Sequence, residues 1–383
     1  MGPKASRAEP AAVVVYRDGL LSYSETFVRD QAERLRRFVP YYVGSRRVRG
    51  LLLPAGQTLV VNGGGVVGKT REALYKLSGV APGFYRRVRR LDPVLVHAHF
   101  GPDGLSALPL ARRLGVPLLT TFHGFDATME DEHARRSFYR HRAYLDGREA
   151  LKREGQLFIA VSGFIKGKLL EQGFPPEKTV VHYNGVDTKA FRPDPNVKRE
   201  PIVLFVGRLV EKKGCEYLIR AMARVQKARP DVELVVIGAG PLLARLKGLA
   251  DASLRRHRFL GARPHGEVRD WMSRALVLCA PSVTAATGDS EGLPTTVVEA
   301  QAMGLPVVST VHAGIPEAVV HGETGLLAAE RDWRELADHI ARLLDDDALR
   351  RRMGERGAER MRASFDLSER TRVLEEIYAS VLR

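Results

Sequence analysis

Hydrophobic and polar positions along the chain form two kinds of pattern, short apolar runs and longer amphipathic stretches. In the first half, the apolar runs predict strands at residues 12–16, 41–43, 58–61, 94–97, 118–122, 158–161 and 180–182. In the second half, they predict strands at residues 202–206, 233–237, 259–260, 276–280 and 307–310. Because stretches of helical period separate these runs, the pattern indicates repeated βα units and parallel sheets.

A polar, proline-marked segment at residues 192–201 separates the two series of predicted strands. We expect it to link an N-terminal domain at residues 1–191 to a C-terminal domain at residues 202–364. The length of 383 residues suits two domains of this size. Near the C-terminus the periodicity predicts helices and no further strand. The helices are expected at residues 332–344, 346–363 and 367–382, and a return of the final segment, 365–383, to the first domain is one possibility.

The composition is that of a soluble globular protein, with 44% hydrophobic residues. No apolar run approaches the roughly 20 residues of a membrane span, and the N-terminal sequence lacks the apolar core of a signal peptide. We therefore expect a cytoplasmic protein. Two cysteines, Cys215 and Cys279, are too few for a disulfide framework or a metal knuckle, and Cys279 fits a buried strand.

The net charge of +15 is concentrated in the first half, where residues 1–190 hold 30 Lys and Arg against 18 Asp and Glu. Two interpretations stay open, solvated faces of an arginine-rich protein or a surface for an acidic partner. Such a partner is anionic lipid at the inner membrane face, a pyrophosphate-linked acceptor or nucleic acid. No recognised nucleic-acid-binding motif accompanies the charge, so we expect no specific nucleic acid. The basic clusters lie at residues 34–37, 46–49, 86–90 and 135–136.

Two glutamates, Glu291 and Glu299, bracket a predicted transition from loop to helix. Gly292 interrupts the chain, and Pro294 suits the first position of a helix that ends near Gly304. The unpaired N–H groups of a first helical turn attract an anion, whereas carboxylates accept hydrogen bonds from hydroxyls. A nucleotide-sugar, which carries phosphates and hydroxyls, fits this combination. The spacing alone is weak, because ordinary surface helices also show it.

A glycine turn with two cations follows the strand predicted at residues 202–206. Gly207 and Arg208 end the strand, and Lys213 stands just before the next predicted helix. Ligands of doubly wound sheets bind beyond the carboxyl ends of strands, and Arg and Lys side chains suit a diphosphate. A second strand and glycine turn, which contains Gly240, is a common βα connection and adds little by itself.

Taken together and in this order, these motifs resemble the retaining glycosyltransferases of family 4, which have the GT-B fold. In the first half the resemblance extends to residues 97–101, 121–126, 160–162 and 184–191. It implies an α/β architecture of two doubly wound, Rossmann-like domains that face a central cleft. It also implies transfer of a hexose-type sugar from a nucleoside diphosphate, UDP or GDP, to a glycan, a lipid-linked saccharide or a small molecule, with retention at the anomeric carbon.

The resemblance assigns roles to particular residues. Arg208 and Lys213 are expected to bind the donor diphosphate, Glu299 the ribose and Glu291 the transferred sugar, while His123 lies beside the anomeric centre. The catalytic candidates are thus His123, Glu291, Arg208 and Lys213. The donor-binding candidates are Gly207, Arg208, Lys213, Gly240, Glu291, Gly292, Leu293, Pro294, Thr295, Thr296 and Glu299. The acceptor-side candidates are Gly19, Ser24, Glu25, Thr26, His97, His99 and Asp126. His97 and His99 either line the acceptor cleft or simply pack.

The first βα loop departs from the paired glycines that many family members carry. It reads Ser-Glu-Thr-Phe at residues 24–27, similar to a variant in some polysaccharide-assembly members. Glu25 is either a ligand residue or an N-terminal helix residue. The resemblance implies no metal and no cofactor. It favours front-face attack, in which the leaving diphosphate, stabilised by Arg208 and Lys213, accepts the proton of the acceptor.

Other functions stay open at this point. Residues 63–70 satisfy the Walker A pattern of P-loop NTPases, with Lys69 in the phosphate-binding position, yet the next predicted strand ends in histidines rather than a magnesium-binding Asp. A glycine-rich loop that leads into a helix at residues 70–77 is the alternative, and a role for it in acceptor binding stays open. A nucleotide-sugar epimerase or a phosphorylase would use the same fold.

Overall fold

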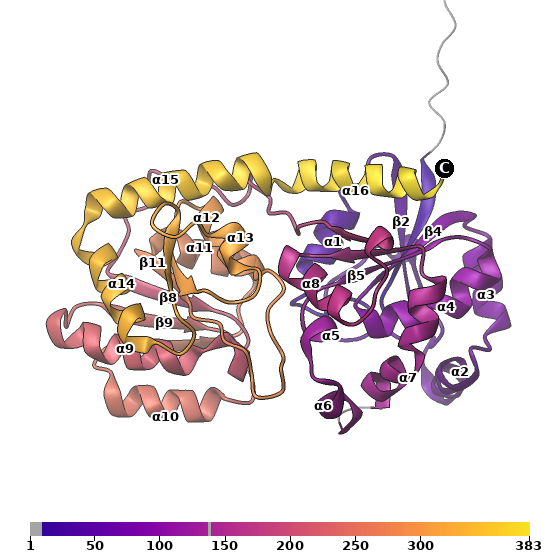
Figure 1. Cartoon of the computed structure of the whole chain (residues 1–383), viewed down its shortest axis with the longest axis horizontal. Coiled ribbons are helices and arrows are strands. Elements are labelled where there is room, and N and C mark those ends of the chain that lie inside the picture. Colours follow the sequence, from indigo (N-terminus) through magenta and orange to yellow (C-terminus); the bar gives the residue numbers. More distant parts are fainter. Residues whose placement is uncertain (1–9, 137–138) are drawn as a thin grey trace, which may run out of the picture.

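The computed structural model describes residues 10–136 and 139–383, which form two parallel sheets in two domains side by side (Figure 1). The first sheet has seven strands in the order β3-β2-β1-β4-β5-β6-β7. They are β1 (Ala11–Tyr16), β2 (Phe38–Gly44), β3 (Thr58–Val60), β4 (Pro93–His99), β5 (Leu118–Phe122), β6 (Leu157–Ala160) and β7 (Thr179–Val181).

The second sheet has six strands in the order β10-β9-β8-β11-β12-β13. They are β8 (Ile202–Val206), β9 (Glu233–Ile237), β10 (His257–Gly261), β11 (Val277–Ala280), β12 (Val307–Thr310) and β13 (Gly325–Ala328). Within both sheets the named strands pair in parallel. The predicted α/β fold of two doubly wound, Rossmann-like domains is therefore confirmed.

Helices connect successive strands and cover both sheets (Figure 1). In the first half they are α1 (Thr26–Ala32), α2 (Gly65–Ser78), α3 (Pro82–Arg89), α4 (Gly101–Leu114), α5 (Phe125–Thr128), α6 (Asp131–Arg136), α7 (Tyr139–Glu154) and α8 (Gly163–Glu171). In the second half they are α9 (Cys215–Ala228), α10 (Leu243–Ser253), α11 (His265–Arg274), α12 (Thr295–Ala302), α13 (Ile315–Ala318), α14 (Trp333–Asp345), α15 (Asp347–Ser364) and α16 (Leu367–Val381). Short 3₁₀ turns are η1 (Ala55–Gln57), η2 (Pro176–Lys178) and η3 (Glu211–Lys213). Among the described helices, none is both long and apolar enough to cross a bilayer.

Strand β13 was not among the predicted strands, whereas the helices expected at residues 332–344, 346–363 and 367–382 are confirmed by α14, α15 and α16. The sequence of β13, Gly-Leu-Leu-Ala, contains no β-branched or aromatic residue and carries little intrinsic strand preference. All four residues are buried, and the strand extends the sheet through the pairing of Gly325 with Val307. Burial against the sheet therefore decides the conformation where local preference does not.

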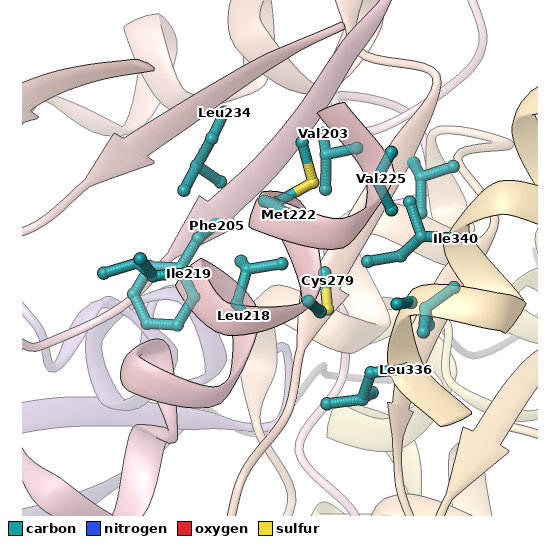
Figure 2. Close-up of a cluster of buried hydrophobic side chains, with 14 of the residues drawn as sticks. Val203, Phe205, Leu218, Ile219, Met222, Val225, Leu234, Cys279, Leu336 and Ile340 are labelled. Atoms are coloured by element: carbon teal, nitrogen blue, oxygen red, sulfur yellow. The ribbon is translucent and has the colours of Figure 1, made fainter. Parts of the chain in front are cut away.

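One of the two core clusters of the second domain lies between its sheet and the helices α9 and α14, and the other lies on the opposite face, against α11, α12 and α15. Figure 2 shows Val203 of β8, Met222 of α9 and Ile340 of α14 among the side chains of the first cluster. All three are completely buried, as expected for a parallel sheet whose faces are both covered by helices. Cys279 of β11 lies in the same cluster, as its apolar sequence context predicted.

The C-terminal helix α16 leaves the second domain and packs against the first (Figure 1). The Tyr378 ring packs edge-on against Phe38, with 5.4 Å between the ring centroids. The Glu375 carboxylate accepts hydrogen bonds at 2.6 Å from the backbone N–H groups of Arg36 and Arg37. The core of the first domain therefore includes the last helix of the chain.

Candidate active site

Loops that follow strands of both sheets meet between the domains. The N–H of Ser290 donates to the Thr128 hydroxyl at 2.9 Å, and the N–H of Glu130 donates to the Thr287 carbonyl at 3.1 Å. Gly292 lies so close to the first domain that a Cβ there would be 2.2 Å from the His123 carbonyl oxygen. Because such strand-end loops hold the ligands of doubly wound sheets, the contacts bring the two predicted halves of the site together.

Glu291 is a buried carboxylate in an ion pair with Lys213, whose Nζ lies 2.8 Å from Oε1. The neighbouring Lys212 binds the Asp289 carboxylate at 2.8 Å and the Ser290 carbonyl at 3.1 Å. Burial alone would raise the pKa of Glu291, but the charges of Lys213 and Lys212 outweigh it and lower the pKa to about 2. The carboxylate is therefore ionised at neutral pH and accepts hydrogen bonds only.

A histidine that sequence reasoning missed fixes the backbone of Glu291. The N–H of Glu291 donates to Nε2 of His312 at 3.2 Å, and Nδ1 of His312 donates to the Glu330 carboxylate at 2.6 Å. These two bonds place the proton of the neutral ring on Nδ1. His312 follows β12 by two residues, so attention to polar residues after every predicted strand would have found it. Glu330 follows β13. Because that strand was not predicted, the same rule would not have found Glu330.

Helix α12 begins at Thr295, and Pro294 is its N-cap residue. The prediction that Pro294 takes the first helical position is therefore wrong by one residue. Proline has no side-chain oxygen, so it offers no capping bond to the first N–H groups of α12. The half-buried residues Thr295 and Thr296 begin the helix beside buried Gly292 and Leu293. The helix ends at Ala302, close to the predicted end.

Glu299 lies one turn into α12 and shares a pocket with the first domain. Its carboxylate is 3.0 Å from Nε2 of His265, a residue that sequence reasoning also missed. The hydrogen bond to Glu299 raises the pKa of His265. Thr295 and Leu293 line this pocket on the second domain, and Thr26 and Phe27 line it on the first. The predicted ribose ligand and the first βα loop thus border one space.

The glycine turns of the second domain allow close backbone packing. A Cβ at Gly240 would lie 2.4 Å from the Leu209 carbonyl oxygen, so only glycine fits there. The side-chain carbons of Lys213 lie 3.5 to 3.7 Å from the position that a Cβ of Gly207 would take, which is van der Waals contact. The side chain of Arg208, which follows Gly207, is exposed. Lys213 and Arg208 therefore lie in one strand-end loop, the first paired with Glu291 and the second open to solvent.

His123 lies in a ring cluster at the carboxyl end of β5. Its ring packs on Phe27 and Phe100 at centroid distances of 4.8 and 4.6 Å, and its Nε2 is 3.1 Å from Nδ1 of His99. Burial, reinforced by the charge of Arg17, lowers the pKa of His123 well below its ordinary value, and the pKa of His99 falls for related reasons. Both rings are neutral at pH 7. Nδ1 of His123 is buried and has no hydrogen-bond partner among the described residues.

Two acceptor-side candidates are engaged within the first domain. Asp126 accepts hydrogen bonds from the N–H groups of Gly101, His123 and Gly124 at 2.9 to 3.0 Å, so it shapes the backbone around His123. Burial raises its pKa to about 6. Both ring nitrogens of His97 are hydrogen-bonded, to Tyr378 and Thr121 at 2.7 and 2.6 Å. Of the two roles left open for His97, the structure supports packing.

The first βα loop is held by charge. Glu25 pairs with Arg17 and accepts a hydrogen bond from the N–H of Ser22 at 3.1 Å. It is the N-cap residue of α1, which agrees with its expected alternative as an N-terminal helix residue. Ser24 is exposed, and Gly19 pairs through an isolated bridge with Arg46. Thr26 is therefore the loop candidate that borders the pocket beside Glu299.

The Walker A pattern does not form a phosphate-binding loop. Helix α2 begins at Gly65, so the expected helix start at residue 70 is wrong and Lys69 already lies in the helix. A P-loop wraps phosphate with a loop across the residues between the first Gly and the Lys, whereas here the residues from Gly65 onward belong to the helix. In the described part of the chain, no group of three or more His, Cys, Asp or Glu residues is arranged to hold a metal ion.

Comparison with known families agrees with this architecture. Residues 24–190 match the family described as Glycosyltransferase Family 4, and residues 187–360 match Glycosyl transferases group 1. The two matches adjoin and together span most of the chain. The chain therefore belongs with the GT-B glycosyltransferases similar to family 4.

Two curated relatives carry names from polysaccharide synthesis. The putative colanic acid biosynthesis glycosyltransferase WcaL of Escherichia coli is 37% identical over 261 residues, which are 66% of this chain and 62% of the relative. The amylovoran biosynthesis glycosyltransferase AmsK of Erwinia amylovora is 35% identical over 65% of this chain and 61% of its own length. The matched region thus spans less than two thirds of these relatives.

A solved structure shows the same fold over nearly the whole chain. The crystal structure of Anabaena Alr3699/HepE in complex with UDP and glucose has a TM-score of 0.76 and covers 97% of this chain and 100% of that one. The sequences are 20% identical, so the likeness supports the fold alone.

Proposed function

We propose that this protein is a retaining glycosyltransferase that moves a hexose-type sugar from a nucleoside diphosphate sugar to a saccharide or lipid-linked acceptor, without a metal. One observation carries the proposal. The ion pair of Lys213 and Glu291, the start of α12 and Glu299 come from the second domain, and Gly292 packs against the backbone of His123 in the first. The cation and the helix amides suit the phosphates of one donor, and the two carboxylates suit its sugar and its ribose.

The leaving diphosphate is the group that gains negative charge in the transition state. In our proposal Lys213, Arg208 and the first N–H groups of α12 stabilise that charge. Glu299 accepts hydrogen bonds from the ribose hydroxyls, and ionised Glu291 accepts them from the transferred sugar. The free Nδ1 of His123 is the ring atom available to a sugar hydroxyl beside the anomeric carbon.

Retention follows from attack on the same face that the diphosphate leaves. The bond between the anomeric carbon and the phosphate oxygen breaks, the bond to the acceptor oxygen forms, and the acceptor proton passes to the leaving phosphate. Burial lowers the pKa values of His123 and His99, so both rings are weak bases for the acceptor proton. This supports the diphosphate as the proton acceptor.

The names of the relatives support an acceptor from polysaccharide assembly, and the basic first half supports peripheral contact with anionic membrane at the cytoplasmic face. The donor base, UDP or GDP, is left to experiment. We propose no cofactor.

The test is a panel of UDP-, GDP- and ADP-sugars, screened by thermal shift and followed by turnover with candidate oligosaccharides in EDTA. A bound donor raises the melting temperature by an amount that grows with its concentration and its affinity. Proton NMR of the product should show the anomer of the donor, and an inverted anomer would overturn retention. Sugar turnover that needs no acceptor would favour an epimerase, and turnover that needs inorganic phosphate would favour a phosphorylase.

A further inference from the structure

Helix α2 turns its apolar side chains away from the protein. Its buried residues are Gly68, Glu72 and Tyr75, which recur at helical spacing on one face. The opposite face is exposed, and it carries Val66, Val67, Leu74 and Leu77, which are 81%, 63%, 50% and 86% exposed. A helix on the surface of a globular protein ordinarily shows the reverse, with apolar residues toward the core. We call these four residues the α2 apolar face.

Basic side chains surround the α2 apolar face. Lys69 and Arg71 are exposed on the flanks of the same helix. The loop after β2 lies beside it, since Nε of Arg46 is 3.8 Å from the Glu72 carboxylate, and this loop adds exposed Arg47 and Arg49. Helix α3 follows within a few residues and carries further arginines on its exposed side. The edge of the first domain at α2 and α3 thus combines an apolar strip with dense positive charge.

We propose that the α2 apolar face docks the protein on an anionic lipid bilayer. An amphipathic helix with aliphatic residues on one face and Lys and Arg at its flanks lies in the interface of a membrane, where the apolar side chains enter the acyl boundary and the cations meet lipid phosphates. Charge complementarity distinguishes this occupant from a second copy of the chain, because a symmetric dimer through α2 would bring like basic clusters together.

The same helix borders a pocket at the carboxyl edge of the first sheet that has charged groups in its lining. Lys76 and Leu77 of α2 line this pocket with Asp18, Arg140 and the half-exposed Tyr139. Asp18 lies 3.2 Å from Lys76 Nζ and 3.3 Å from an Arg140 nitrogen. Docking through α2 places this pocket at the bilayer surface, where the saccharide of a lipid-linked acceptor would be presented. This last step rests on the proposed function, whereas the docking itself does not.

Vesicle flotation of the full chain tests the docking surface. With vesicles of phosphatidylglycerol and phosphatidylcholine, the parent protein should float, and Leu74→Ser with Leu77→Ser should lower its partition coefficient at least about tenfold. Both side chains are exposed, so the thermal melt should stay unchanged. The matched control is Val311→Ser with Leu382→Ser, which removes two exposed apolar side chains elsewhere and should float as the parent does.

A second pair of variants tests the electrostatic part. Lys69→Glu with Arg71→Glu should weaken flotation about tenfold, whereas Lys247→Glu with Arg255→Glu, an equal charge change on the second domain, should have a much smaller effect. Pure phosphatidylcholine vesicles, or about 0.5 M NaCl, should weaken the binding of the parent.

Undiminished flotation of the Leu74 and Leu77 variant would overturn the proposal. So would self-association in sedimentation without lipid that this variant abolishes, since a second copy would then be the occupant. Flotation is measured without nucleotide, and donor binding is measured without vesicles. Failure of docking and failure of the proposed glycosyl transfer are therefore read separately.

Discussion

The two domains hold their candidate site residues by different means. In the second, charge dominates, since Lys213 pairs with Glu291 and Lys212 with Asp289. In the first, the neutral ring of His123 is fixed by aromatic packing, by His99 and by the bonds that Asp126 makes to its backbone. Around Glu291 the second domain suits a charged ligand, whereas at His123 the first domain presents a neutral, desolvated ring. A donor diphosphate and an acceptor hydroxyl differ in the same way.

The largest effect should come from the charged side. Glu291→Gln keeps the size of the side chain but removes the charge that pairs with Lys213, and we expect kcat/KM for transfer to fall roughly 100- to 1,000-fold. Steady-state kinetics with the identified donor would measure it. The control is Glu355→Gln, an exposed site on α15 that should leave transfer unchanged. Equal rates for both variants would place Glu291 outside the reaction.

The same charge should appear in the pH dependence of stability. Glu291 has its pKa lowered to about 2 in the folded protein, against an ordinary value of 4.5. Its contribution is therefore complete above about pH 4.5 and is lost as the pH falls toward 2, by up to roughly 3 kcal/mol. Denaturant melts at pH 7 and pH 3 should show a greater loss for the parent than for Glu291→Gln. Parallel losses would mean that the carboxylate is not held ionised.

A change at the contact between the domains should also lower the transfer activity. Gly292→Ala forces a methyl group against the His123 carbonyl, so the domains must separate or the loop must shift. We expect transfer to fall about 100-fold, because misplacement of reacting groups by about an ångström has effects of that size. Nucleoside diphosphate affinity should change only a few fold, as measured by calorimetry. Gly266→Ala, where a methyl group meets open space, is the control.

A smaller effect is expected at an interdomain helix cap. The Glu317 carboxylate of α13 accepts hydrogen bonds from the N–H groups of Gly163 and Phe164 at the start of α8, and from Tyr183, at 2.8 to 3.0 Å. Glu317→Ala should cost about 1 to 2 kcal/mol of unfolding free energy in denaturant melts. Exposed Glu323→Ala should cost much less, and equal losses would contradict the capping role.

Local pattern predicted much of this fold. Buried strands such as Ile202–Val206 are continuous apolar runs between turn residues, so neighbouring positions in the sequence are enough to predict them. Strand β13 escaped because Leu and Ala carry no strand signal and only pairing with β12 orders them. Helix α2 began earlier than expected because Gly64 and Gly65, which suggest a loop, supply the positive φ angles of 108° and 66° by which the chain enters the helix.

The residues of the candidate site were also predicted only in part. The order of motifs indicated Lys213, Glu291 and Glu299, since each lies in or after a recognisable strand-end loop. His312 and His265 act through partners 21 and 34 residues away, respectively, and no local spacing reports such contacts. The bond from α16 that fixes His97 spans 281 residues. Long-range packing therefore decides which of the predicted polar residues are free to meet a ligand.

The central claim is that the second domain binds a nucleoside diphosphate through Lys213. Calorimetric titration of UDP and GDP into the parent, Lys213→Ala and Lys69→Ala tests it without any acceptor. The account predicts that one nucleotide binds the parent, that Lys213→Ala weakens this binding at least about tenfold, and that Lys69→Ala leaves it unchanged. If Lys69→Ala loses binding and Lys213→Ala binds like the parent, the account is contradicted and the P-loop interpretation of residues 63–70 is favoured.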